Sequence, residues 1–268
     1  MGQSNFATLL VEHIQEIGVI WLNRPEQKNA FNDQMIADLH QAILGMQADQ
    51  RVRAVVLAAK GDAFCAGADL AWMRRMADAD EETNRQDAQA LADMLHAIYI
   101  CPKPVIARVH GHTFGGGVGL VAACDIAVAQ DGLLFALSEA KLGLIPATIS
   151  PYVINAIGPR MAHRYFLTAE RFSASEAHRI QLVHAVTSAE ELDDAIDSLL
   201  NHILLNGPHA VAQAKQLIQM QRGRELDDTL RAETAQHIAQ IRRGPEAQEG
   251  IRAFLEKRKP SWVPKITG

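Results

Sequence analysis

The sequence is poor in cysteine and has no long apolar run. Its three cysteines, Cys65, Cys101 and Cys124, contain no C-x-x-C pair, so the sequence predicts buried free thiols in a reducing compartment instead of a disulfide framework. No stretch of 18 apolar residues is present, which argues against a membrane-spanning helix. The first ten residues also have no basic segment followed by a long apolar one. The expected location is the cytoplasm.

An excess of basic residues is also absent. The chain has 26 Lys and Arg against 31 Asp and Glu, a formal net charge of −5, which argues against nucleic acid or an acidic membrane surface as a partner. The 11 histidines show no H-E-x-x-H and no cysteine–histidine spacing, so no metal site is expected. A G-x-S-x-G elbow, typical of serine hydrolases, is missing as well.

What is present is enough apolar sequence for a large core. With 268 residues, 48% of them hydrophobic, the chain can fold as one large domain or as a domain with an extension. Residues 7–23 predict a hairpin with its turn near Gly18, and "VRAVVLAA" and "PVIARV" predict buried strands that each follow a helix. The first of these helices has cap candidates in Asn32 and Asp33. Alternating helices and buried strands predict an α/β fold with parallel pairing.

The pattern changes after about residue 150. Five segments favour helices, and only "LVHAVT" resembles a strand. We expect a core over residues 1–200 and a helical region over 201–268. The apolar residues of that region predict either a subunit interface or packing within the chain, and they are Leu217, Ile218, Ile238, Ile241, Ile251, Phe254 and Leu255.

A glycine-rich stretch, "FGGGVGLVAACD", raises the central question. Gly115, Gly116, Gly117 and Gly119 fall at the start of an apolar helical segment, where each glycine costs about 0.5–1 kcal/mol relative to alanine. Phosphate binding does not explain them, because neither a G-x-G-x-x-G nor a Gly-Lys-Ser/Thr ending fits the spacing. Unpaired N–H groups at the start of a helix can, however, hold an oxyanion.

A second turn offers another such N–H group. "AFCAGADL" follows the other buried strand and turns at Gly67 and Ala68. Two turns at the ends of neighbouring parallel strands are expected to converge. Taken alone, each glycine is better explained by a tight turn or by close helix packing than by a functional site.

These motifs resemble those of the enoyl-CoA hydratase/isomerase family, also called the crotonase superfamily. The likeness rests on "AFCAGADL", "GGGVGLVAACDIAVA" and "FALSEAKLGLIPA" in this order, and it extends from "LNRPEQKNAF" to "FLEKRKP". It implies a spiral of repeated ββα units with a helical C-terminal region. The substrate would be an acyl-CoA thioester, with no cofactor besides the coenzyme A that the substrate itself carries.

The resemblance also implies roles for particular residues. The family's oxyanion hole, made of two peptide N–H groups, falls on Ala68 and Gly116. The run from Ala68 through Asp69 and Leu70 to Ala71 matches the coenzyme A-binding stretch. Lys28 and Arg24 are candidates for binding the phosphates of coenzyme A. The alternative is that both are solvated surface charges. Trp72, Met73 and Met76 would lie beside the acyl tail of the substrate. The alternative is that they only pack within the protein.

Two glutamates flank the double bond in the family hydratases with the fullest motif. The second is present as Glu139, with an ion pair to Lys141 as the structural alternative, but the first position is Gly119. Hydration needs water activation and protonation of a carbon, whereas moving a double bond needs one carboxylate. His112 either orients the nucleophile or makes a structural hydrogen bond.

Two further stretches favour hydration. "GADLAWMRRM" and "GLIPATISPYV" resemble the methylglutaconyl-CoA and carboxygeranoyl-CoA hydratase branch, which acts in leucine and acyclic-terpene breakdown. Arg74 and Arg75 would then meet a distal carboxylate, or form a solvated helix face. We therefore expect a hydratase of a branched or carboxylated 2-enoyl-CoA that uses Glu139, in a homotrimer or a dimer of trimers. The alternatives are an enoyl-CoA isomerase using Glu139 alone and a catalytically silent acyl-CoA-binding protein.

Overall fold

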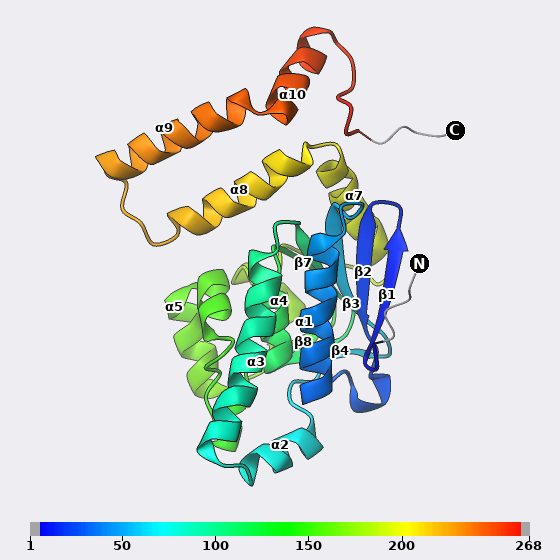
Figure 1. Cartoon of the computed structure of the whole chain (residues 1–268). Coiled ribbons are helices and arrows are strands. Elements are labelled where there is room, and N and C mark those ends of the chain that lie inside the picture. The colour runs from blue at the N-terminus through cyan, green and yellow to red at the C-terminus, as the bar shows by residue number, and fades with distance from the viewer. Residues whose placement is uncertain (1–5, 264–268) are drawn as a thin grey trace. The chain divides into compact units, whose positions relative to one another are not determined.

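The computed structural model describes residues 6–263 and divides into two compact units. Unit 1 comprises the residues up to Cys101 together with Val105–Ile196, and unit 2 comprises Pro102–Pro104 with the residues from Asp197 onward (Figure 1). The first five residues of the N-terminal segment considered above lie outside the described residues. Within residues 6–263, no helix combines the length and the apolar character needed to cross a bilayer.

The larger sheet of unit 1 has six strands in the order β1-β2-β3-β5-β7-β10. Their bounds are β1 (Leu9–Ile14), β2 (Ile17–Leu22), β3 (Ala54–Ala59), β5 (Val105–Val109), β7 (Ile126–Gln130) and β10 (Ala185–Thr187). Only β1 pairs antiparallel, and the other neighbours are parallel. Strand β3 is buried along its whole length, as its continuous apolar run predicts for a strand covered on both faces.

A second, four-stranded sheet consists of short strands in the order β4-β6-β8-β9. Their bounds are β4 (Ala63–Cys65), β6 (His112–Phe114), β8 (Leu134–Ala136) and β9 (Phe172–Ser173). Each of the first three follows a strand of the larger sheet along the chain, and these three pair in parallel. The repeated ββα units are therefore confirmed, and the carboxyl ends of β4, β6 and β8 share one edge.

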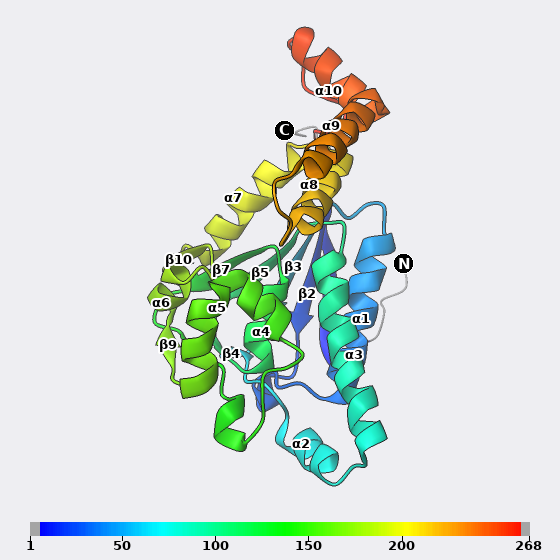
Figure 2. The same ribbon diagram turned by 90° about the vertical axis from the view of Figure 1, so that its left-hand side faces the viewer.

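Helices cover the sheets of unit 1. Their bounds are α1 (Asp33–Ala48), α2 (Leu70–Ala77), α3 (Glu81–Ile100), α4 (Gly116–Ala123), α5 (Ser150–Thr168) and α6 (Ala174–Arg179), with the 3₁₀ turns η1 (Pro25–Gln27) and η2 (Glu139–Leu142). Helices α1 and α3 pack side by side (Figures 1 and 2). The predicted cap of α1 is confirmed, because the Asn32 side chain accepts a hydrogen bond from Met35 N at 2.9 Å. Cys65 and Cys101 are buried and Cys124 is half-buried, and none of the three is in a disulfide.

The predicted hairpin is present, but the predicted position of its turn is wrong. Gly18 lies within β2 opposite His13, and the turn falls at Gln15 and Glu16, where Gln15 has φ 54°. Gly18 serves close packing instead, because a Cβ there would lie 2.3 Å from the sulfur of Met46. This contact joins residues distant in sequence, so a local turn rule could not reveal it.

Unit 2 is helical, as the sequence predicts. Helix α7 (Leu192–Leu204) begins in unit 1, and α8 (Pro208–Gln221), α9 (Asp228–Arg243) and α10 (Pro245–Leu255) follow. The Glu246 carboxylate at the start of α10 accepts hydrogen bonds from His209 N and Ala210 N, and so satisfies the free N–H groups at the start of α8. The exposed apolar side chains of α8, α9 and α10 are Ile218, Met220, Ile238, Ile251, Phe254 and Leu255.

Candidate functional site

Three loops meet at the shared edge of the short sheet. Ala68 comes soon after β4, Gly116 follows β6 after the single residue Gly115, and Glu139 comes soon after β8. A Cβ built on Gly115 would lie 3.4 Å from Glu139 Oε1 and 3.7 Å from Gly67 Cα. The predicted residues Ala68, Gly116 and Glu139 therefore lie around one point, although they are distant in sequence.

The Ala68 amide is left free by the way its segment pairs. Ala68 forms a parallel bridge with Phe31, in which Phe31 N donates to Gly67 O at 2.7 Å and Asp69 N donates to Phe31 O at 2.8 Å. In such a parallel bridge one residue, here Phe31, makes both hydrogen bonds. The residue opposite it, here Ala68, uses neither its N–H nor its C=O in the pairing. Ala68 is exposed, so its N–H group is available to a ligand.

Gly116 provides the other amide, at the start of α4. Gly115 precedes the helix with φ 51° and ψ −122° and no side-chain cap, a conformation open to glycine alone. Gly115 O accepts from Val118 N and Gly119 N, while the Gly116 N–H has no acceptor among the residues described. This donor carries the positive end of the helix dipole.

Glu139 is a half-buried carboxylate without a counter-charge. No ion pair joins it to Lys141 in the described part of the chain, and its Oε2 is buried with no hydrogen-bond partner. Burial raises the pKa of Glu139 above its usual 4.5, and a hydrogen bond from its own amide opposes this only in part. A carboxyl whose pKa is raised in this way is suited to take up and return a proton.

The position of the absent glutamate is filled by an isoleucine. A Cβ on Gly119 would lie 2.2 Å from Ile149 Cγ2 and 2.6 Å from Ile149 Cβ. Ile149 is 2% exposed and immediately precedes α5. Since Gly115 and Gly119 are four residues apart at the start of one helix, they share a face. Glu139 lies over the first position of this face and Ile149 over the second, so the wall beside the carboxylate is apolar.

We expect the Gly119–Ile149 contact to appear as coupling in a double-mutant cycle. Gly119→Ala should destabilise the protein by about 1–3 kcal/mol through overpacking, despite the gain of about 1 kcal/mol that alanine gives over glycine in a helix. Ile149→Ala should cost about 2–5 kcal/mol. The double variant should cost at least about 1 kcal/mol less than the sum, measured by urea unfolding. Additive effects would mean that the two residues do not share the space.

Asp69 holds its own loop and the start of α2. Its carboxylate accepts hydrogen bonds from Ala71 N, Trp72 N and the Arg24 guanidinium, at 2.9, 3.1 and 2.9 Å. Burial opposes ionisation of Asp69, but these bonds outweigh it and lower its pKa. The Asp69 side chain is thus used within the protein, and its predicted contact with coenzyme A stays a prediction for the main chain of this loop.

The other predicted substrate-binding residues differ in their accessibility. Leu70 is 81% exposed and Ala71 is exposed, so both are open to a ligand. Trp72 is buried, and its indole N–H donates to Asp87 at 2.9 Å. That bond joins α2 to α3 and agrees with the packing alternative.

Of the predicted phosphate-binding residues, Lys28 is available and Arg24 is not. Arg24 is largely buried and pairs with Asp69 and Ala30 O. Lys28 has an exposed side chain, while its carbonyl accepts from Ala66 N at 3.0 Å. His112 Nδ1 accepts from Leu134 N at 3.1 Å, which is the structural hydrogen bond considered above.

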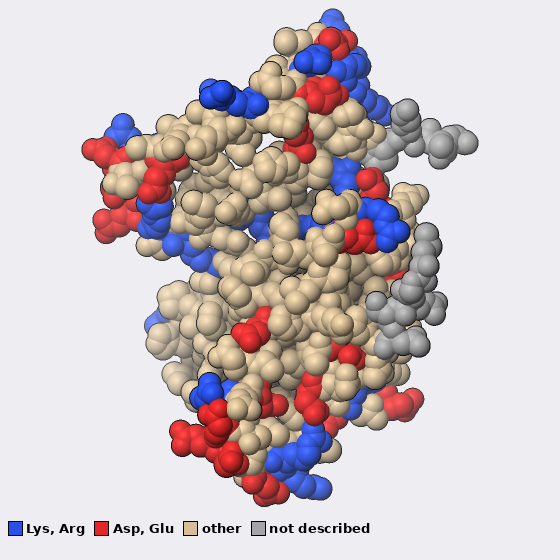
Figure 3. Space-filling model, viewed as in Figure 1, with Lys and Arg blue, Asp and Glu red and all other residues tan. Residues whose placement is uncertain are grey.

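The face in Figure 3 mixes both signs of charge. Acidic and basic side chains lie intermixed over α2 and the start of α3. Both arginines of α2 are exposed, but Arg75 pairs with Asp33 at 2.8 Å, whereas Arg74 has no ion pair among the described residues. If a distal carboxylate binds on α2, Arg74 is therefore the better placed of the two arginines.

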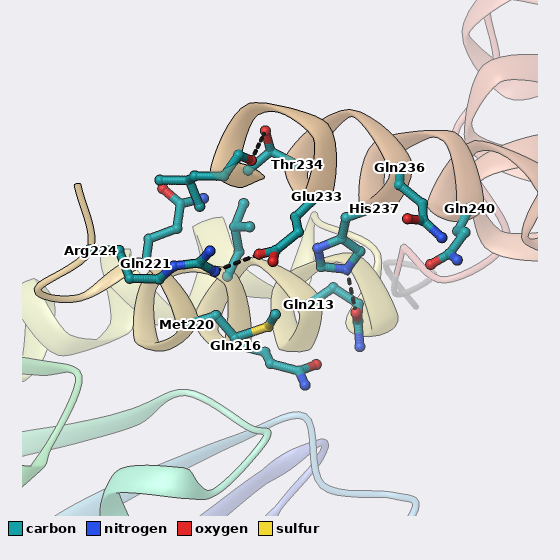
Figure 4. A pocket seen from close by; sticks show the side chains of 12 residues that line it. Gln213, Gln216, Met220, Gln221, Arg224, Glu233, Thr234, Gln236, His237 and Gln240 are labelled. Atoms are coloured by element: carbon teal, nitrogen blue, oxygen red, sulfur yellow. Dashed lines mark hydrogen bonds and ion pairs between the residues drawn. The ribbon is translucent and has the colours of Figure 1, made fainter. Parts of the chain in front are cut away.

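Unit 2 contains a separate cavity of about 320 Å³ between α8 and α9 (Figure 4). Its arginine and glutamate, Arg224 and Glu233, pair with each other, and His237 hydrogen-bonds Gln213 at 2.9 Å. Most of its other polar side chains are glutamine amides, which do not supply acid–base chemistry. Across residues 6–263, no three His, Cys, Asp or Glu side chains are grouped as metal ligands would be.

Comparisons with known proteins agree with the fold. The family model described as Enoyl-CoA hydratase/isomerase matches residues 12–265. A putative enoyl-CoA hydratase of Thermus thermophilus is 34% identical over 91% of this chain and 96% of that protein, and a short-chain-enoyl-CoA hydratase of Clostridium acetobutylicum is 31% identical over 94% and 95%. The crystal structure of an enoyl-CoA hydratase from Shewanella pealeana superposes with a TM-score of 0.94 at 39% identity, covering 97% of each chain. The expected spiral of ββα units is thereby confirmed.

Proposed function

Because this chain belongs to the enoyl-CoA hydratase/isomerase family, we propose that it adds water to the double bond of a 2-enoyl-CoA thioester at the site formed by Ala68, Gly116 and Glu139. The observation that carries the proposal is the convergence of two free amides and a half-buried carboxyl beyond the ends of β4, β6 and β8. Hydration of enoyl-CoA esters is what the relatives' names describe. The roles of the individual residues are our own assignment.

The amides polarise the substrate. The thioester oxygen accepts hydrogen bonds from Ala68 N and Gly116 N. These bonds draw electrons from the conjugated double bond and make the β-carbon of the substrate electrophilic. When an enolate forms, its oxygen carries the new charge, and preorganised donors stabilise that charge most. Gly115, where a Cβ would point toward Glu139, lets the thioester approach the main chain.

Glu139 moves the proton in both steps. As a carboxylate it accepts a proton from water while the water oxygen bonds to the β-carbon of the substrate and the double-bond electrons shift to form the enolate. As a carboxylic acid it then returns that proton to the α-carbon of the substrate, on the same face of the former double bond. Net, H and OH add across the double bond and Glu139 regains its charge. One carboxyl is enough for both proton transfers. This agrees with the apolar wall that Ile149 forms at Gly119, where no second carboxyl is present.

That same wall favours isomerisation as the second candidate. Moving a double bond between a 3-enoyl and a 2-enoyl ester needs one group that removes a proton from one carbon and delivers it to another. Glu139 is such a group, and the side chain of Ile149 occupies the space of a second.

One spectroscopic experiment separates these functions. A hydratase should remove the ultraviolet absorbance of the conjugated thioester in a 2-enoyl-CoA, and an isomerase should create it from a 3-enoyl-CoA. We expect the first result to dominate. Tight binding with neither change would contradict the proposal and identify a silent acyl-CoA-binding protein.

We further propose a branched or carboxylated acyl chain, as found in leucine breakdown. The proposal is supported by the resemblance of "GADLAWMRRM" and "GLIPATISPYV" and by the exposed Arg74 on α2. In the same assay, a 3-methylglutaconyl-CoA should give a higher kcat/KM than crotonyl-CoA. The acyl chain would lie against Met73 and Met76.

For the assembly we propose a homotrimer or a dimer of trimers, with contacts made by unit 2. Exposed apolar side chains on α8, α9 and α10, such as Ile218 at 71% and Phe254 at 82%, are unusual on a monomer's surface. The cytoplasmic location and the absence of a further cofactor stay predictions.

A further inference from the structure

We propose that Phe31 is a positioning residue that fixes the two amides relative to each other, an inference that rests on the proposed function. Phe31 touches both amide-bearing segments, one through its main chain and the other through its ring. It contributes no group to the chemistry itself.

The main chain of Phe31 sets the orientation of Ala68. Its N–H donates to Gly67 O at 2.7 Å and its C=O accepts from Asp69 N at 2.8 Å. The peptide groups on both sides of Ala68 are therefore fixed, which leaves the Ala68 N–H pointing away from Phe31. Any shift of the Phe31 main chain would therefore move this amide.

The ring of Phe31 limits the position of Gly116. A Cβ on Gly116 would lie 2.9 Å from both Cδ2 and Cε2 of Phe31, so the ring packs directly against the bare Cα. Phe31 is 1% exposed, and a well-packed interior transmits such contacts with little slack. The ring thus acts as a spacer between the loop of Ala68 and the start of α4.

Phe31 is itself held by a loop that Asn29 and Arg24 fix through hydrogen bonds. Asn29, fully buried and at φ 53°, donates through Nδ2 to Lys60 O at 2.8 Å and Ala63 O at 2.9 Å. Its Oδ1 accepts from Arg24 N at 2.8 Å. The Arg24 guanidinium reaches Ala30 O and Asp69. These bonds tie the residues around Phe31 to both ends of the β4 segment.

A smaller or more flexible side chain at position 31 should therefore loosen the amide pair. Phe31→Leu leaves space beside Gly116, and a displacement of about 1 Å can cost about 10²-fold in rate. We expect kcat to fall by about 10- to 100-fold, while KM changes by less than about threefold, because the interaction lost is made chiefly in the transition state.

The test uses 4-(dimethylamino)cinnamoyl-CoA, whose absorption moves to longer wavelength when its thioester carbonyl is polarised. The wild-type protein should produce a red shift, and Phe31→Leu should bind the probe with a clearly smaller one. Phe172→Leu is the matched control: this buried phenylalanine stacks on Phe135 and makes a tilted ring contact with Tyr165, and its loss should leave the red shift intact. Phe31→Met, which nearly conserves volume, serves if the leucine variant does not fold.

The outcomes distinguish the two proposals. Binding without any red shift in the wild-type protein would overturn the proposed function. A wild-type red shift that Phe31→Leu and Phe31→Met retain in full, with unchanged kcat, would overturn the role of Phe31 alone. An equal loss in Phe172→Leu would overturn it too, since any core change would then have the same effect.

Discussion

Glu139→Gln should lower kcat for hydration by about 10³- to 10⁴-fold, with little change in binding of the substrate. General acid–base catalysis contributes about 10²–10⁴-fold per group, and here one carboxyl serves both proton transfers. Glutamine keeps the size of the side chain but cannot accept a proton. Stopped-flow loss of the thioester absorbance measures kcat, and calorimetric titration with a saturated acyl-CoA measures binding.

The same variant should be slightly more stable at neutral pH. Burial raises the pKa of Glu139, so the folded state holds this proton more tightly than the unfolded state does. The free energy of unfolding gained from this tighter proton binding is fully present below pH 4.5. It is lost as the pH rises through the pKa that Glu139 has in the folded state. Glutamine mimics the protonated form, so its melting temperature at pH 7 should exceed that of the wild type.

Activity should show the opposite pH dependence. The base form of Glu139 is populated only above its raised pKa, so kcat/KM should rise with pH through a value above 4.5. The matched control is Glu190→Gln, an exposed glutamate of unit 1, which should leave the rate, the melting temperature and the pH profile unchanged. Wild-type turnover by Glu139→Gln would remove Glu139 from its role.

Gly116→Ala should lower kcat/KM by about 10²–10³-fold. The new Cβ would lie 2.9 Å from the buried ring of Phe31, so the start of α4 must move and take the amide with it. Loss of one oxyanion donor costs about this much in rate. Overpacking should also lower stability by about 1–3 kcal/mol, which urea unfolding can measure.

Gly45→Ala provides the control for a glycine-to-alanine change in a helix. Gly45 lies in α1, and a Cβ there would have nothing within 4 Å. This variant should gain about 0.5–1 kcal/mol in stability and keep full activity. If Gly116→Ala also keeps full activity, the Gly116 amide does not contact the substrate.

Local signals in the sequence predicted where free amides would lie. Glycines between a strand and an apolar helix indicated them at the start of that helix, and the turn at Gly67 and Ala68 indicated another. The family resemblance then assigned the two amides to Gly116 and Ala68. Helix caps such as Asn32 were also readable, since capping involves residues three apart. Glu139 was found through the family resemblance and not through any periodic pattern.

Other features were beyond local reasoning. Strands of three residues, such as β4 and β6, are too short for a period of two to show. Ile149 meets Gly119, and Phe31 meets Gly116, only because the chain folds back on itself. For the same reason Gly18, typical of a turn, proved to be a packing site beneath Met46.

The most direct measurement of the central claim is a crystal structure of the Glu139→Gln variant with a bound 2-enoyl-CoA. We predict that the thioester oxygen lies within hydrogen-bond distance of both Ala68 N and Gly116 N, with the residue-139 amide beside the double bond. A thioester oxygen that contacts neither amide, or a double bond remote from residue 139, would contradict the account.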